Sequence, residues 1–233
     1  MAWEARQAAV AHAPGTTPAE QALIDALTRR YAGPEPREPA AMQPLTLAYA
    51  EAMRSVAQRF PADMDVQVLF AEALMNQNPW KLWSLDGAPA PGTEEIVATL
   101  ERVLATSPDH PGANHYYIHA VEASRSPERA LPAAKRLPGL MPGAGHMVHM
   151  PAHIFQRVGL YAEASTRNRE AVAADLAYMA RVKPWGYYPM YLGHNYGFWA
   201  YSAAMEGRRA ESLAAARASA KAEENRRHLV HFN

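Results

Sequence analysis

Apolar residues recur along the chain at helical spacing in many short segments, and turn-forming residues separate these segments. Most of the 19 prolines fall between the periodic segments and so punctuate them. Ala, Leu, Glu, Arg and Met dominate, and the runs of Val, Ile and Thr that are typical of strands are missing. The pattern therefore predicts an all-α chain built from short helices.

Two segments of the chain repeat with an offset of 34 residues. SPDHPGANHYYIHAVEAS lines up with LMPGAGHMVHMPAHIFQRVG, so that His115 matches His149 and His119 matches His153. This offset is the period of the tetratricopeptide repeat, a helical hairpin that buries its apolar face only by stacking on its neighbours. We therefore expect an α-solenoid: a tetratricopeptide-repeat-like (TPR-like), right-handed superhelical array of antiparallel helix pairs.

The repeat frame extends in both directions and predicts a single TPR-like domain over residues 1–233. Two segments rich in Trp, Tyr and Pro interrupt the frame, and they either form flaps over one face or only cover helix ends. The predicted parts are irregular N-terminal helices at 1–60, repeats at about 61–110, 111–144, 145–178 and 193–225, and insertions at 78–92 and 179–192.

The same frame places six of the ten histidines on one face, the concave groove lined by the first helices. Within a first helix, the second, fifth, ninth and twelfth residues share a side because steps of three and four residues keep the same azimuth. Glu122 extends this face by one turn, and His146 and His194 hold the second position of their repeats. The candidate metal ligands are the pairs at the fifth and ninth positions: His115, His119, His149 and His153.

Two histidine pairs on adjacent helices could offer three or four nitrogens and a carboxylate to one ion at about 2.0–2.2 Å. Imidazole and carboxylate without thiolate suit zinc, iron, copper or nickel and argue against calcium, so we expect a divalent transition metal as cofactor. The alternative is a polar network without metal, because adjacent helices stand about 8–10 Å apart. The segment HYYIH lacks the glutamate of the HExxH motif, which removes the main support for a zinc protease.

A groove-bound metal suggests a metal-dependent enzyme that acts on a small molecule, either a hydrolase or an oxidoreductase, and the sequence leaves this choice open. In that reading Glu122 is a ligand or general base, and His146 or His194 is an outer-shell acid or substrate contact. The alternative is a peptide- or protein-binding scaffold without catalysis, the commonest role of the architecture. A third possibility is that the chain is one module of a larger enzyme or complex.

Charge and composition exclude several other classes. Lys and Arg together number 23 and balance 23 Asp and Glu, so no basic surface is expected to attract nucleic acid or anionic lipid. No stretch approaches about 20 consecutive apolar residues, and the N-terminus shows no secretion signal, so we expect a cytoplasmic protein without a membrane partner. The chain has no cysteine, which excludes disulfides and thiolate metal sites.

Several long motifs resemble a group of bacterial tetratricopeptide-repeat proteins. The matching segments are NHYYIHAVEAS (Asn114 to Ser124), GHMVHMPAHIFQRVGLY (Gly145 to Tyr161), YYPMYLGHN (Tyr187 to Asn195) and PGTEEIVATLERVLATSPDHPGANHYYIH, and the resemblance covers most of residues 20–220. It implies the repeat fold and marks the histidine segments as hallmarks of the group, but it supplies no reaction. Members of the group are longer and carry further repeats ahead of the matched part, so the resemblance raises the expectation of a longer protein.

Overall fold

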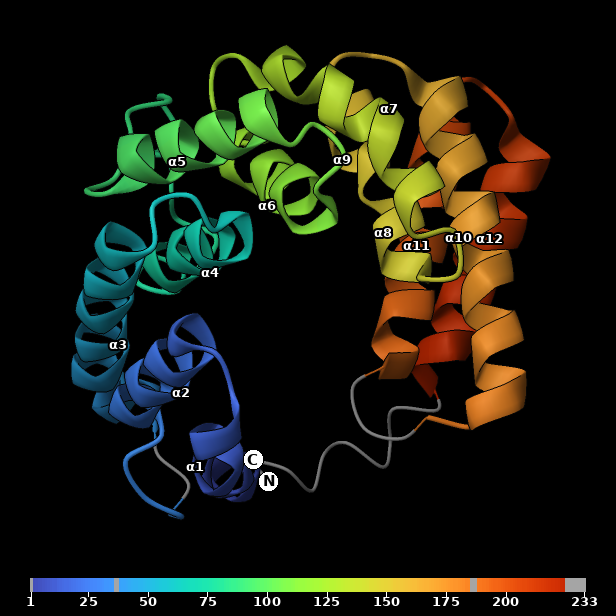
Figure 1. The fold of residues 1–233 in the computed structure, drawn as a ribbon. Helices are drawn as coiled ribbons and strands as arrows, with labels where there is room; N and C mark the ends of the chain where they lie inside the picture. Colours follow the sequence, from blue (N-terminus) through green and yellow to red (C-terminus); the bar gives the residue numbers. More distant parts are fainter. Residues whose placement is uncertain (1, 36–37, 185–187, 225–233) are drawn as a thin grey trace. The chain divides into compact units, whose positions relative to one another are not determined.

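The computed structural model (Figure 1) describes residues 2–35, 38–184 and 188–224. Within these ranges the chain is helical apart from turns, short 3-10 segments and one isolated bridge between Trp83 and Pro89, which confirms the all-α prediction. None of the described helices combines the length and the apolar character needed to cross a membrane. The α-helices are α1 (Ala2–His12), α2 (Pro18–Arg30), α3 (Pro39–Arg59), α4 (Met64–Met75), α5 (Thr93–Thr106), α6 (Pro111–Val121), α7 (Leu131–Leu140), α8 (Gly145–His149), α9 (Pro151–Arg157), α10 (Tyr161–Val182), α11 (Tyr188–Met205) and α12 (Arg209–Glu224).

The helices group into two compact units, Met1–Tyr116 and Tyr117–Asn233. The division between them falls inside α6. The single repeat domain that the sequence suggests over residues 1–233 stays a prediction.

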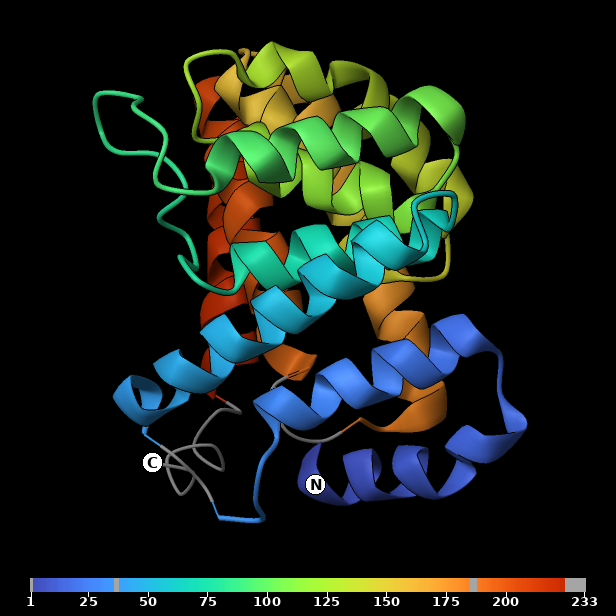
Figure 2. The same ribbon diagram turned by 60° about the vertical axis from the view of Figure 1, so that its left-hand side comes forward.

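In the first unit α2 packs against α3, α3 against α4, and α4 against α5. Met53, Val66 and Leu100 are fully buried at these contacts. An irregular loop joins α4 to α5 and contains the predicted insertion at residues 78–92; it projects from the ends of the two helices in Figure 2.

In the second unit α10 packs against α8, α9 and α11, and α11 packs against α12. These last three long helices run side by side in Figure 1. Ile118, Leu137, Met150 and Ile154 form the fully buried core, and each side chain of this size contributes about 1.5–3 kcal/mol when it leaves water. The second unit therefore has an apolar core that fixes the helices carrying most of the histidines.

A proline divides the first helix of one hairpin into α8 and α9. Pro151 has no N–H group, so it cannot donate to the preceding turn, and it starts α9 in the first helical position. The backbone of Met150 keeps helical angles (φ −48°, ψ −37°), so α8 and α9 follow each other closely. His149 and His153 thus remain one turn apart across the proline.

The segment at 179–192, predicted to be an aromatic insertion, is largely helical where it is described. The helix α10 continues to Val182, Lys183 ends it in a left-handed conformation (φ 48°), and α11 begins at Tyr188. Residues 185–187 of this segment lie outside the described residues. The turn that follows α11 contains Gly207 in the left-handed conformation (φ 71°), which glycine adopts without strain.

Gly145, the first residue of α8, leaves room for a buried carboxylate. A Cβ atom at this position would lie 2.0 Å from Oδ1 of Asp175. Asp175 is fully buried and accepts hydrogen bonds from the Tyr188 hydroxyl (2.9 Å) and the Asn195 amide (2.8 Å). The carboxylate therefore ties α10 to α11, and a glycine at the start of α8 is what allows it to fit.

We expect Gly145→Ala to lower the free energy of unfolding by about 1–3 kcal/mol, because the new methyl group would collide with a buried side chain that has no room to move. Urea denaturation measures this loss. Gly143→Ala is the matched control, since nothing lies within 4 Å of a Cβ there. Equal stability of the two variants would show that Asp175 does not need the space at Gly145.

Candidate metal centre

Three histidines from three helices of the second unit bring their Nε2 atoms together. His149 ends α8, His153 lies in α9, and His194 lies in α11. The Nε2 atom of His149 is 3.0 Å from Nε2 of His153 and 3.1 Å from Nε2 of His194. One ring nitrogen from each of the three residues lies within 4.8 Å of those of the other two. We call these three residues the histidine triad.

The tautomer of His149 follows from its buried neighbour Asn168. The Asn168 amide nitrogen donates to the carbonyl oxygen of Ala164 (2.7 Å), so its oxygen must face His149. Nδ1 of His149 lies 2.7 Å from that oxygen and is therefore the protonated nitrogen. The Nε2 atom of His149 consequently carries a lone pair toward the other two histidines.

The carboxylate of Glu122, directly after α6, orients two further imidazoles. Its oxygens accept hydrogen bonds from Nδ1 of His119 (3.0 Å) and Nδ1 of His153 (2.5 Å). Burial alone would raise the pKa of Glu122, but these two hydrogen bonds and the associated charges lower it to about 2. The ionised carboxylate thus places a proton on Nδ1 of His153 and leaves its Nε2 atom as the nitrogen that faces His149.

The triad contains more close nitrogen contacts than hydrogen bonds can satisfy. Nε2 of His149 has a single lone pair, yet it has two nitrogen neighbours at about hydrogen-bonding distance. A proton on Nε2 of either neighbour would satisfy one of these contacts, but the other contact would remain. A metal ion accepts lone pairs from all three nitrogens at once. Three nitrogens around one tetrahedral ion stand about 3.3 Å apart. The two distances from Nε2 of His149 lie within a few tenths of an ångström of this value.

The surroundings of His149 and His194 favour the neutral form of both rings. Burial, followed by the neighbouring charges of His153 and His194, lowers the pKa of His149 well below its usual range. Desolvation is also the main cause of the lowered pKa of His194. Metal ligation requires the neutral ring, so the site favours binding without the need to remove protons at neutral pH.

The other predicted site residues lie beside the triad or one turn away. His146 stacks against His149 and His119, with ring centroids 6.2 Å away in each case, and desolvation lowers its pKa to about 4. His119 contacts His153 (5.6 Å) and shares Glu122 with it. His115 lies one turn before His119 in α6. The residue that completes the triad is His194, to which the sequence assigned the role of outer-shell acid or substrate contact.

Two contributors to the site were not singled out from the sequence. Asn168 lies on α10, the second helix of its hairpin, and the rule used to find groove residues considers only first helices. Phe198 follows His194 by one turn of α11, and its ring centroid lies 4.6–4.8 Å from those of the three triad histidines. The same rule of four-residue spacing could have identified Phe198 as part of this face.

In the metal-free protein at neutral pH, we expect His149 to be neutral with its proton on Nδ1, and His153 to carry a proton on Nδ1, because Asn168 and Glu122 each present an acceptor to that nitrogen. Long-range proton–nitrogen NMR of ¹⁵N-labelled protein separates protonated from unprotonated ring nitrogens. The variant Asn168→Asp keeps the acceptor and is expected to keep the His149 tautomer, whereas Asn168→Leu should lose it. A proton on Nε2 of His149 in the unmodified protein would contradict the assignment.

No known family model matches the sequence, and no curated protein does either. Solved structures do resemble it. "MamA RS-1 ArsTM double mutant" has a TM-score of 0.59 and 11% identity over 79% of this chain and 88% of that one. "Crystal structure of MamA" has a TM-score of 0.59 and 10% identity, with coverage of 82% and 98%. "MamA 41-end from Desulfovibrio magneticus RS-1" has a TM-score of 0.53 and 15% identity, with coverage of 81% and 90%.

At such low identity the likeness concerns the fold alone. The likeness agrees with the antiparallel helix pairs of the second unit and with the 34-residue period of the sequence. The chain has a TPR-like helical repeat fold.

Proposed function

We propose that the protein binds a divalent transition metal ion through the Nε2 atoms of His149, His153 and His194. The observation that carries this proposal is the close approach of three imidazole nitrogens, whose mutual contacts cannot all be hydrogen bonds. Two of these nitrogens belong to a four-residue pair that spans α8 and α9, and the third comes from a helix distant in sequence.

The residues behind the triad support the same assignment. A metal-bound histidine commonly donates its second ring N–H to a carboxylate, a backbone carbonyl or another polar acceptor, which fixes the ring and raises its basicity. Glu122 does this for His153, and Asn168 does it for His149. In this arrangement Glu122 positions the ligands, and it is not itself bound to the metal.

The donor set limits the choice of metal and leaves a coordination position open. Imidazole without thiolate suits zinc, iron or copper. Three protein ligands are typical of catalytic sites, where a water or substrate occupies the fourth position and a bound water loses its proton near neutral pH. His194 is exposed, so small molecules have access to the triad from its side. We therefore propose metal-dependent chemistry on a small molecule, hydrolytic with zinc and oxidative with iron or copper.

We expect the protein, purified without a histidine tag, to retain about one transition metal ion per chain at the histidine triad, because three histidine ligands hold one ion. His153→Ala and His194→Ala should each lose it, because two ligands do not hold an ion against dialysis. Plasma mass spectrometry measures the metal content. His12→Ala, at the exposed end of α1, is the control and should keep the metal.

Metal at a hundredfold excess over its dissociation constant should stabilise the unmodified protein by about 2.7 kcal/mol and the two triad variants by much less. A protein that takes up no zinc, iron or copper, even after incubation with each, would overturn the proposal. Peptide pull-downs would then test the scaffold function that the fold also permits.

We expect Glu122→Gln to weaken metal binding by about 10–100-fold, because a neutral amide cannot accept from both His119 and His153 and no longer raises the basicity of the bound ring. Competition with a chromophoric chelator measures the dissociation constant. Glu163→Gln on the exposed surface of α10 makes the same change in charge and should leave the affinity unchanged. Equal affinity of the two variants would remove Glu122 from the site.

A further inference from the structure

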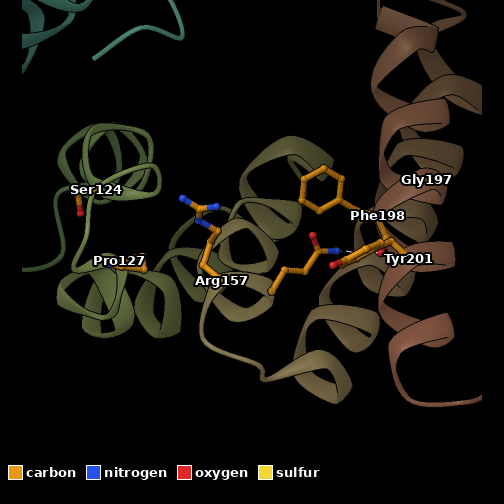
Figure 3. A pocket seen from close by; sticks show the side chains of 7 residues that line it. Ser124, Pro127, Arg157, Gly197, Phe198 and Tyr201 are labelled. Atoms are coloured by element: carbon orange, nitrogen blue, oxygen red, sulfur yellow. Dashed lines mark hydrogen bonds between the residues drawn. The ribbon is translucent and has the colours of Figure 1, made fainter. Parts of the chain in front are cut away.

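A pocket of about 560 Å³ adjoins the histidine triad in the second unit. Figure 3 shows the guanidinium group of Arg157 and the ring of Phe198 projecting into it from α9 and α11. The lining residues are Ser124, Pro127, Gln156, Arg157, Gly197, Phe198 and Tyr201. We propose that this pocket binds the carboxylate group of a small carboxylic acid whose other end coordinates the metal, an inference that rests on the proposed function.

The pocket continues the metal site along the same helices. Arg157 follows His153 by one turn of α9, and Phe198 follows His194 by one turn of α11. One helical turn is about 5.4 Å long, the length of a short carbon chain. Phe198 belongs to both sites, because its ring contacts the three triad histidines and also lines the pocket. A ligand that reaches the metal therefore extends naturally toward Arg157.

One hydrogen bond holds the guanidinium group of Arg157 in place, and its terminal N–H groups remain available as donors. Its Nε atom donates to the backbone carbonyl oxygen of Glu122 (2.7 Å), which anchors the guanidinium plane at the end of α6. Among the residues that the structure describes, no acceptor lies within hydrogen-bonding distance of its two terminal nitrogens. These two nitrogens form the planar fork that binds both oxygens of a carboxylate.

The carboxylate of Glu122 does not neutralise this cation. Both carboxylate oxygens of Glu122 accept from histidines, and only its main-chain oxygen contacts Arg157. Phe198, Tyr201 and Pro127 supply apolar surface to the same pocket. The combination of one fixed guanidinium, an apolar wall and a metal with an open position fits a short acid that carries a metal-binding group at its far end.

Cobalt(II) provides a spectroscopic test with two separable readouts. Visible d–d bands first report that cobalt occupies the triad, and a new near-ultraviolet charge-transfer band then reports binding of a thiolate. The probes are 3-mercaptopropionate and its neutral match 3-mercaptopropanamide. We expect the cobalt protein to bind the acid at least about tenfold more tightly than the amide, as a charge-assisted pair predicts.

Arg157→Gln should abolish the preference for the acid while the cobalt bands persist, and Arg157→Lys should retain part of it because a point charge cannot form the fork. Arg181→Gln, at the exposed end of α10, makes the same change in charge and should leave the preference intact.

Gly197→Leu tests the pocket without changing the charge of Arg157. A Cβ there meets only Ser219 Oγ at 3.9 Å, so the larger side chain can fill the pocket and should weaken acid binding without loss of cobalt.

Equal affinity for acid and amide, with the cobalt bands present, would overturn the carboxylate assignment and leave the metal site standing. A preference that survives Arg157→Gln would do the same. Absence of cobalt bands in the unmodified protein would overturn the metal site itself, and the carboxylate assignment with it.

Discussion

The single lone pair on Nε2 of His149 is the constraint on which the site depends. His149 is fully buried, and its Nδ1 atom donates a hydrogen bond to Asn168. The ring therefore cannot turn to offer a second nitrogen to its neighbours. His153 and His194 both approach this one lone pair at about 3 Å. In a low-dielectric interior an unsatisfied contact of this kind is costly, and a cation that accepts three lone pairs relieves it. The arrangement is therefore best understood as a preorganised ligand set.

Glu122 links the histidine triad to the adjoining pocket through two different groups. Its side chain orients His119 and His153, and its main-chain oxygen holds Arg157. Because that carboxylate is committed to two imidazoles, it does not pair with the nearby guanidinium. One short segment at the end of α6 thus orients both His153, a proposed metal ligand, and the guanidinium that we propose receives an anionic group.

Local rules predicted much of the architecture. The 34-residue period indicated paired helices, and the structure has them. The segment at 179–192 was interpreted as an inserted loop, but its described ends belong to α10 and α11. The content of Trp, Tyr and Pro predicts an insertion there. In the structure, however, Tyr188 is the first residue of α11, and its hydroxyl donates a hydrogen bond to Asp175. Tertiary contacts of this kind override a compositional signal.

The sequence by itself determined the helical hairpins and the common face of most histidines, because helical periodicity is a local property of the chain. It also limited the candidate metals to those that imidazole binds. Only the tertiary structure decided that His194 joins His149 and His153 while His119 turns to Glu122, and that Asn168 fixes the tautomer. These choices depend on how side chains of packed helices meet at distances of a few ångströms, and equivalent positions in successive repeats do not specify such distances.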